Sequence, residues 1–377
     1  MSQNIFLTVN IVLIVVCIVI PLFFLFIPIP QKKGLKNYRI SLRFLALAYF
    51  ALSVLTVIGV YHGNIETDYV MNLTAISLQT ILFAFSLIVL LNPNFSNTYL
   101  VLKHLIPTFT VVILSVFFKI IWKYQPLHTI TEFIHHSDQP SAVVALLFFI
   151  FCIVQLVYFF RLFHLQLKKY EAKLDDYYAD TYRLKLHWVS YCFYAATFFC
   201  VLVIISILIP DSLFGVIVTA INSLFYVVFG LCYIQYPSIF HIIEPALNTY
   251  ILSQNIDQPV TAKALSWEKL KSKIISEKFY LHSEINIEEM AQYLKIGRTT
   301  LSNFINKEEN VNFHTWINRL RIEEAKQLIR NNHDMSVMQI AEQIGYSESS
   351  HFSRQFKQIT GESPTVWRQR QSQDEQP

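Results

Sequence analysis

The 377-residue sequence has little charge and little glycine. Only 15% of its residues are charged and only eight are glycine, whereas 54% are apolar. Because no glycines cluster and neither G-x-G-x-x-G nor a P-loop is present, the chain lacks a glycine-rich cradle for nucleotide phosphates. It also lacks H-E-x-x-H and G-x-S-x-G, the signatures of zinc proteases and of many serine hydrolases. We therefore expect a protein that is not an enzyme and needs no cofactor.

The cysteines give no sign of a metal or redox site. All five lie within apolar runs, without the C-x-x-C spacing that zinc sites and thiol redox centres use. A free cysteine in such a run packs as a small hydrophobic side chain. We assign this role, with no disulfide indicated, to Cys17, Cys152, Cys192, Cys200 and Cys232.

The scarce charge is unevenly distributed and divides the chain near Tyr236 and Pro237. Residues 1–240 hold 14 basic and 9 acidic residues, whereas residues 241–377 hold 16 and 17. The first part is too apolar for an ordinary soluble domain, and the second has the charge density of one. We expect an all-α protein with a membrane domain, a cytoplasmic linker, a folded cytoplasmic domain and a polar tail, at residues 1–236, 237–264, 265–370 and 371–377.

Seven apolar stretches are long enough, or nearly so, to cross a bilayer, which takes about 20 helical residues. They lie at Ile5–Ile29, Leu42–Tyr61, Val70–Leu91, Leu105–Trp122, Ala142–Phe160, Trp188–Ile209 and Leu213–Tyr233. The first is too long for a removable signal peptide and lacks its small-residue cleavage site. The pattern predicts a bundle of seven transmembrane helices.

The short loops between these stretches carry their basic residues on one side. Lys and Arg favour the cytoplasmic loops of membrane proteins, and twelve of the fourteen lie in the odd-numbered loops. The two exceptions are Lys119 and Lys123. This bias places the N-terminus outside the cell and the C-terminus in the cytoplasm.

The membrane part shows no ion pathway, and one external loop leaves two interpretations open. No Asp or Glu falls inside the seven stretches, whereas ion-coupled transporters usually keep ionisable residues at membrane depth. On a helix, His128, Glu132 and either His135 or His136 would share a face, as metal ligands or as a pH sensor. The alternative is an ordinary solvated loop, and on that interpretation no metal is bound.

The largest cytoplasmic loop of the membrane part is the fifth, His164–His187. It alternates basic residues with an acidic and aromatic run, LDDYYAD, at Leu174–Asp180. We interpret this loop as a solvated helical connector. The alternative is a contact with the C-terminal domain that passes on a signal.

The most informative stretch is Ser336–Gly361, SVMQIAEQIGYSESSHFSRQFKQITG. Ser336 and Gln339 have the S-x-x-Q spacing of a capping box, which marks the start of a helix. Ala341 is small where two crossing helices must approach, and Gly345 can take the positive φ of a sharp turn. The stretch therefore predicts a helix-turn-helix, a shape that places its second helix in a DNA major groove.

The same pattern occurs fifty residues earlier, at Asn286–Asn310. Asn286 and Glu289 repeat the capping-box spacing. Ala291 and Leu294 match Ala341 and Ile344 at the same spacing of fifty. With one residue inserted, further matches pair Leu301, Asn303 and Ile305 with Phe352, Arg354 and Phe356. The intervening stretch Phe313–Arg330 has the apolar spacing of a buried connecting helix. Such a connector would hold the two reading helices about one DNA turn apart, roughly 34 Å.

On these residues, the segment Leu265–Arg370 resembles the AraC/XylS-type DNA-binding domain over its whole length. The most specific part is IGYSESSHFSRQFKQITGESPTVWR, Ile344–Arg368. The fusion to seven spans is similar to the membrane-anchored one-component regulators of Bacteroides-like bacteria. The resemblance implies two helix-turn-helices that read promoter DNA.

The resemblance also implies which side chains face the DNA. The base-facing residues would be Thr299, Ser302 and Asn303 in the first recognition helix, and Ser349, Ser350, His351 and Arg354 in the second. Arg can bind guanine with two hydrogen bonds, Asn suits adenine, and Ser or Thr can pair with either. The residues placed for phosphates, which set register without reading sequence, are Arg298, Lys307 and Lys357.

Two positions depart from the family pattern, both in the first motif. Lys295 stands where the first turn usually has Gly, and Gly297 stands where an N-capping Ser is usual. Gly is an acceptable N-cap, but a left-handed Lys is strained by roughly 1 kcal/mol. We therefore expect the second motif to be the stronger of the two.

These features predict a one-component transcriptional regulator in the bacterial cytoplasmic (inner) membrane. Its membrane part would perceive a small-molecule or membrane signal, and its cytoplasmic domain would bind double-stranded promoter DNA. Over Lys263–Ser372, 16 basic and 13 acidic residues leave a net charge of only +3, so a homodimer would help binding. RNA polymerase is a further candidate partner. The alternatives are a transporter or enzyme with a regulatory appendage, and a DNA–membrane tether that senses nothing.

Overall fold

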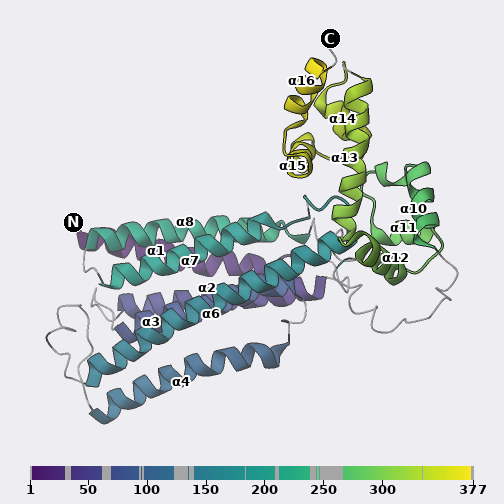
Figure 1. Cartoon of the computed structure of the whole chain (residues 1–377). Coiled ribbons are helices and arrows are strands. Elements are labelled where there is room, and N and C mark those ends of the chain that lie inside the picture. Colours follow the sequence, from purple (N-terminus) through teal and green to yellow (C-terminus); the bar gives the residue numbers. More distant parts are fainter. Residues whose placement is uncertain are drawn as a thin grey trace. The chain divides into compact units, whose positions relative to one another are not determined.

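The computed structural model describes most of the chain (Figure 1). The described residues are 2–29, 35–61, 69–92, 97–122, 140–182, 184–208, 212–237, 266–332 and 334–374, with Phe95, His135, Ile243 and Ala246. Within them the elements are helical, apart from one isolated β-bridge. The all-α class is therefore confirmed.

The chain divides into two compact units. The first comprises Met1–Lys168 and Leu186–His241, and the second comprises Lys169–Lys185 and Ile242–Pro377. The predicted linker at residues 237–264 lies outside the described residues, except for three isolated positions.

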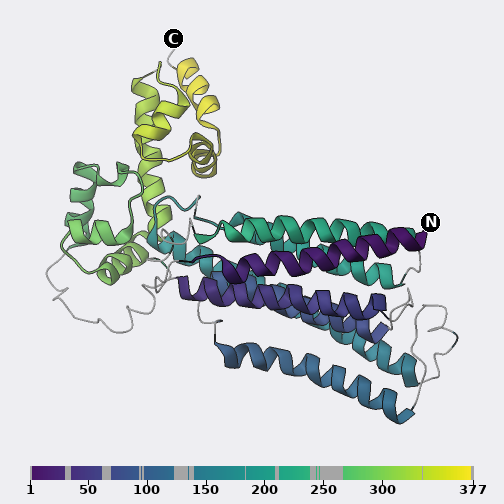
Figure 2. The ribbon, with the colours of Figure 1, turned by 180° about the vertical axis from the view of Figure 1, so that it is seen from behind.

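The first unit consists of long helices that run alongside one another (Figures 1 and 2). Their bounds are α1 Ser2–Phe26, α2 Lys36–Tyr61, α3 Tyr69–Leu91, α4 Thr98–Trp122, α6 Pro140–Tyr177, α7 His187–Leu208 and α8 Ser212–Ile234. By length and composition, all seven of these described helices are long and apolar enough to cross a membrane. Each one coincides with a predicted stretch, although α6 continues well beyond Phe160 and its last turns belong to the second unit.

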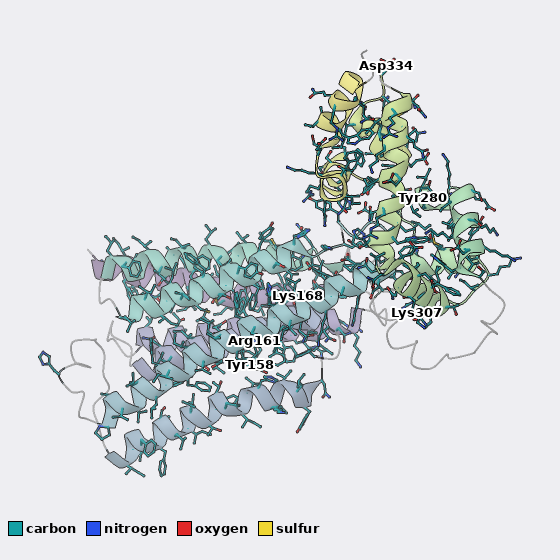
Figure 3. All side chains as sticks on the ribbon, in the orientation of Figure 1. Tyr158, Arg161, Lys168, Tyr280, Lys307 and Asp334 are labelled. Carbon is teal, nitrogen blue, oxygen red and sulfur yellow. The ribbon has the colours of Figure 1, made fainter. Side chains whose placement is uncertain are left out.

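The helix α3 is the centre of the first unit. In its most apolar window 83% of the residues are buried, against 17–33% in the other six helices, and α2, α4 and α7 pack against it. The outer helices expose apolar side chains, such as Ile113 (65%) and Leu147 (62%), and their sticks in Figure 3 are mostly carbon. Apolar surface of this extent suits lipid better than water.

Polar side chains inside the first unit hydrogen-bond to one another or to backbone carbonyls. Ser77 donates to Gln155 Oε1 over 2.7 Å, and its hydroxyl lies 3.0 Å from that of Thr108, which joins α3, α6 and α4. Gln79 donates to the Ala48 carbonyl over 2.7 Å. Such pairs satisfy polar groups at membrane depth and hold helices together.

The second unit contains two helix-turn-helix pairs with a long helix between them. The bounds are α10 Trp267–Ser276, η4 Phe279–Leu281, α11 Ile287–Tyr293, α12 Arg298–Phe304, the π-turn η5 Ile305–Glu309, α13 Phe313–Asn331, α14 Val337–Gln343, α15 Ser349–Thr360 and α16 Pro364–Asp374. We call α11 with α12 the first motif and α14 with α15 the second motif. Figures 1 and 2 show α13 between them.

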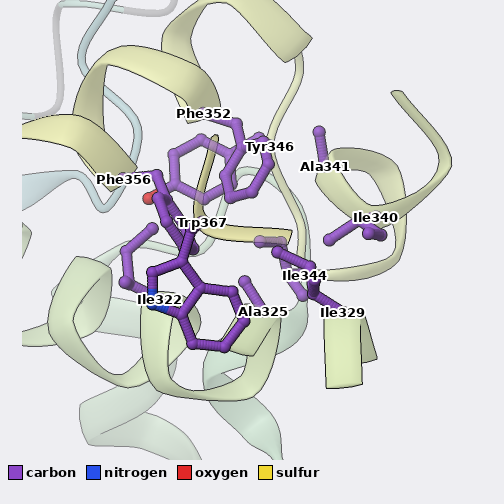
Figure 4. Close-up of a cluster of buried hydrophobic side chains, with 10 residues drawn as sticks. All are labelled: Ile322, Ala325, Ile329, Ile340, Ala341, Ile344, Tyr346, Phe352, Phe356 and Trp367. Atoms are coloured by element: carbon purple, nitrogen blue, oxygen red, sulfur yellow. The ribbon is translucent and has the colours of Figure 1, made fainter. Parts of the chain in front are cut away.

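The second motif packs on α13 around an aromatic core (Figure 4). Phe352 and Phe356 of α15 have ring centroids 5.6 Å apart, and Trp367 of α16 lies 5.9 Å from Phe356. Ile322 and Ala325 of α13 complete this core from below. Because Phe352 and Phe356 are four residues apart, one face of α15 is buried and the opposite face is left to solvent.

Candidate DNA-binding surface

The second motif begins with a complete capping box. The Ser336 hydroxyl accepts from the Gln339 amide over 3.2 Å, and the Gln339 side-chain oxygen accepts from the Ser336 amide over 2.8 Å. In the following turn Gly345 has φ +84°, and the Tyr346 amide donates to the Ala341 carbonyl over 2.9 Å. The predicted cap and turn are confirmed.

The first motif has the same backbone turn. Asn286 caps α11, and its side-chain oxygen accepts from the Glu289 amide over 3.0 Å. Lys295 adopts a left-handed φ of +57°, and the Ile296 amide donates to the Ala291 carbonyl over 3.0 Å. The internal repeat predicted from the residues is therefore real in three dimensions, and Lys295 does occupy the strained conformation.

The recognition helices α12 and α15 present equivalent polar faces. Leu301 and Phe352 are both fully buried, and they bring the two helices into the same register. The exposed polar residues then pair as Thr299 with Ser350 and Asn303 with Arg354. Each helix therefore offers one hydroxyl and one larger side chain that can hydrogen-bond to a base edge.

The remaining predicted contact residues vary in exposure. Lys307, labelled in Figure 3, and Lys357 are exposed. Ser302 and Ser349 are half-buried. Arg298 is also half-buried, and its guanidinium lies 5.8 Å from the ring of Tyr177.

One buried arginine joins the two motifs. Arg321 of α13 donates from Nε to the Tyr280 carbonyl and from Nη2 to the His282 carbonyl, each over 2.8 Å. Its guanidinium also lies 5.4 Å from the ring of Tyr346 in the second turn. Since Tyr280 and His282 precede the first motif, Arg321 fixes one motif against the other. The predicted buried connecting helix is confirmed as α13, in which Trp316 is 2% exposed.

His351 is covered in this structure. It is only 5% exposed, and its Nδ1 lies 3.1 Å from Oδ1 of Asp180. Its ring also stacks on that of Tyr182 with centroids 5.2 Å apart. His351 sits on the flank of α15, between the core and the exposed face, where a neighbouring segment covers it. In this structure it is not open to a base.

Asp180 is the charged partner in this contact. Burial alone would raise the pKa of its carboxyl group. The nearby imidazole of His351, with hydrogen bonds from the Tyr182 amide and the Ser347 hydroxyl, outweighs burial and holds the pKa of Asp180 well below its usual range. The carboxylate is therefore ionised at neutral pH.

Asp180 and Tyr182 belong to Lys169–Lys185, the part of the fifth loop that lies in the second unit. We call it the docked segment. Tyr178 forms an antiparallel bridge with Asn286, and the Ala179 amide donates to the Ile285 carbonyl over 3.1 Å. Both contacts reach the start of the first motif.

The docked segment also contacts the connecting helix. The Ala179 carbonyl lies 2.6 Å from Nδ1 of His314, and it accepts from the side-chain Nδ2 of Asn318 over 3.0 Å. Our interpretation of the fifth loop as a solvated connector is therefore wrong over this segment. The acidic and aromatic run LDDYYAD was the signal, but it carries no information about which surface it meets.

The predicted metal candidates cannot be placed together. Of the four loop residues, only His135 is among the described positions, and His128, Glu132 and His136 lie outside them. In the described part of the chain, no three His, Cys, Asp or Glu residues gather where they could hold a metal ion.

Comparison with known families agrees with this geometry. A family model described as a helix-turn-helix domain matches residues 290–370, from α11 to α16. The C-terminal part of the chain is thus an AraC-type helix-turn-helix domain, following an N-terminal part of seven long apolar helices.

Several curated proteins are similar to part of this chain. The regulatory protein PocR of Salmonella typhimurium is 24% identical over 140 residues, covering 36% of this chain and 46% of PocR. The transcriptional regulator ExsA of Pseudomonas aeruginosa is 32% identical over 103 residues, covering 27% and 36%. The chain therefore spans less than half the length of these relatives. Both relatives are named as regulators.

Solved structures match the same small share of the chain. The C-terminal domain of the response regulator yesN from Fusobacterium nucleatum is 26% identical, covers 27% of this chain and 96% of that domain, and has a TM-score of 0.25. The C-terminal domain of AraT from Geobacillus stearothermophilus is 28% identical, with coverages of 28% and 87% and a TM-score of 0.26.

Proposed function

We propose that this protein is a membrane-embedded one-component regulator of transcription. In this proposal α12 and α15 bind promoter DNA sequence-specifically, while the seven apolar helices anchor the protein in the bacterial cytoplasmic membrane and perceive a signal. The observation that carries the proposal is the pair of equivalent motifs with exposed polar faces, in one chain with seven helices of membrane-spanning length.

The geometry of the motifs supports binding to DNA. Arg321 and α13 hold the two recognition helices at one spacing and orientation, as binding in two successive major grooves requires. Arg354 is suited to guanine and Asn303 to adenine. The exposed Lys307 and Lys357 can neutralise phosphates, although the modest net charge leaves much of the affinity to base contacts or to a second copy.

Genome-wide mapping of the DNA bound in the native host tests this function. We expect discrete promoter regions to be enriched with the natural protein and lost with a Thr299→Ala/Asn303→Ala/Arg354→Ala variant. Lys326→Ala, which removes a positive charge from α13 and leaves the recognition helices unchanged in sequence, is the control and should retain the enrichment. Equal enrichment with the triple variant would show that these faces do not read DNA.

The predicted topology needs a separate test. Basic residues in the odd-numbered loops support a cytoplasmic C-terminus. A fluorescent protein fused at the C-terminus should be bright, and an alkaline phosphatase fused there should be inactive because it works only outside the cytoplasm. The opposite pair of results would invert the topology and remove access to DNA.

The transcriptome of a deletion strain separates regulation from tethering. A regulator should alter the operons whose promoters it occupies. Occupied promoters with unchanged transcripts would favour a tether that senses nothing. Altered uptake of a solute without occupied promoters would favour a transporter with an appended domain.

A further inference from the structure

The docked segment reaches α12 through an aromatic ring. The ring of Tyr177 lies 5.8 Å from the guanidinium of Arg298, the first residue of α12. Tyr177 is also tied down, because its hydroxyl donates to Glu288 over 2.7 Å.

The docked segment reaches α15 and the turn before it through an aromatic ring and a carboxylate. The ring of Tyr182 lies 4.4 Å from the guanidinium of Arg354. Asp180 accepts from the Ser347 hydroxyl over 2.8 Å and pairs with His351 at 3.1 Å. An aromatic ring therefore meets an arginine at each recognition helix, and a carboxylate meets His351 at the second.

These groups resemble those that DNA would offer. A carboxylate, like a phosphate, pairs with a cation, and an aromatic ring, like a base, stacks against a guanidinium. The major groove is about 12 Å wide and an α-helix with its side chains measures about 10–12 Å across. A groove that admits α15 therefore has no room for a segment lying on the flank of that helix.

The described residues of the docked segment hydrogen-bond to one another. Its turn is closed by Thr181, which donates to Asp175 over 2.9 Å, and by Lys185, which lies 3.4 Å from the same carboxylate. Tyr170 donates to the Leu184 carbonyl over 2.9 Å. Thr181 of this turn is 1% exposed. A segment of this kind can dock and release as one piece.

We propose that the docked segment is an autoinhibitory element that competes with DNA for both recognition helices. This inference rests on the proposed function of the second unit. DNA binds when residues 177–182 leave α12 and α15, and the docked state is the closed form of the regulator. Because α6 is one continuous helix from Pro140 to Tyr177, a displacement of its apolar part moves Tyr177. A signal in the membrane then shifts the balance between docked and released states.

The first test measures DNA affinity of the full chain in nanodiscs, on a promoter fragment recovered from the mapping experiment. Asp180→Asn/Tyr182→Ala removes the contacts with α15, so we expect DNA to bind about tenfold more tightly than to the natural protein, within the usual range of coupling between sites. The control Glu171→Gln removes the same charge earlier in the segment and should leave the affinity unchanged.

The possible outcomes distinguish the two proposals. Equal or weaker binding by the double variant, with the second motif still folded, overturns autoinhibition and leaves DNA binding intact. If neither protein binds any promoter fragment even at low salt, the proposed function itself fails and autoinhibition fails with it.

The second test needs no variant. The Ala179 amide is hydrogen-bonded to Ile285, so its hydrogen exchange reports docking. Saturating the natural protein with the promoter fragment should speed exchange across residues 177–182, while the Tyr346 amide inside the second motif stays protected. Unchanged protection of residues 177–182 in the DNA-bound protein would overturn the proposal.

Discussion

The two helix-turn-helix motifs share one backbone design and realise it with different residues. Each turn contains a left-handed residue followed by an amide that bonds back to a buried alanine, Ala291 or Ala341. The left-handed residue is Lys295 in the first motif and Gly345 in the second. A side chain in this conformation costs roughly 1–2 kcal/mol, so the first motif carries strain that the second avoids.

The surroundings of the two turns explain the difference. A Cβ atom on Gly345 would lie 2.3 Å from the Leu281 carbonyl oxygen and 2.9 Å from Nη2 of Arg321. Lys295, by contrast, is exposed, and its side chain extends into solvent. Glycine is therefore required in the second turn by space as well as by φ, because that turn packs against the segment preceding the first motif.

The recognition helices also end differently. The helix α15 has twelve residues and ends at Gly361, which has φ +87°. The helix α12 has only seven and runs into the π-turn. There Glu309 accepts from the Trp267 indole over 2.8 Å and from Lys271 over 2.7 Å. The end of α12 is thus held by tertiary contacts with α10, whereas α15 ends in a regular glycine C-cap.

The largest predicted effect is a loss of stability that distinguishes steric overlap from backbone strain. Gly345→Ala should destabilise the second motif by roughly 3 kcal/mol or more, because the new methyl group is both strained and overlapped. Gly361→Ala is the matched control, since its φ is also positive but no atom lies within 4 Å of the new Cβ. It should cost only about 1 kcal/mol. Hydrogen exchange of the Tyr346 amide in the full chain measures both, and equal losses would contradict the packing argument.

The second prediction compares the equivalent positions Arg354 and Asn303. Arg354→Ala should weaken binding to a target promoter by about 1–3 kcal/mol and relax its specificity at one base pair. Asn303→Ala should cost less, because an amide forms no charge-assisted bond. The measurement is promoter affinity against unrelated DNA, with Lys357→Ala as the phosphate control that weakens both alike. A larger loss for Asn303→Ala would make the first motif the principal reader.

The third prediction relieves the strain in the first motif. Lys295→Gly should stabilise it by roughly 1 kcal/mol, the cost of the left-handed conformation. Lys295→Ala keeps the Cβ atom and should give no gain. Slower exchange of the Ile296 amide in the glycine variant alone is the expected result. Equal gains in both variants would mean that the lysine charge, and not its φ, limits stability.

The smallest predicted effect is a pH dependence of stability, at the place where α13 contacts the docked segment. Burial of His314 lowers the pKa of its imidazole, aided by Lys185 and His351 and opposed by Asp175 and the Ala179 carbonyl. A lowered pKa means that the neutral form is favoured in the fold, so its stabilising contribution is present above the unfolded pKa of about 6.5 and is lost as pH falls through the folded value.

We therefore expect the stability of the second unit to decline between about pH 7.5 and pH 5.5, measured by hydrogen exchange of α13 amides in the full chain. His314→Gln should flatten this dependence. Asp180, whose pKa is lowered from the ordinary value near 4, adds a further loss only below that pH. A decline of the same size in the His314→Gln variant would assign the effect to another group.

Features with short sequence separation were predictable. The capping box of Ser336 and Gln339 depends on residues three apart, and the turn at Gly345 depends on the residue type itself. The repeat followed from matching buried positions such as Leu301 and Phe352.

Features that join distant residues were not predictable. Asp180 contacts His351, which lies 171 positions later in the sequence. Arg321 donates to backbone carbonyls, which a residue of any type would present. Neither contact leaves a spacing rule in the chain. For the same reason, the sequence did not decide whether the run LDDYYAD faces solvent or contacts the recognition helices.

The sequence by itself determined the helices, their caps, the two motifs and the seven apolar spans, because periodicity, turn residues and hydropathy act over a few residues at a time. Only the tertiary structure decided that position 345 must be glycine while position 295 can carry a side chain. It also decided that His351 is covered and that Tyr182 lies on Arg354. Those outcomes depend on which surfaces meet after folding, and each meeting is selected by shape, charge and burial over the whole second unit at once.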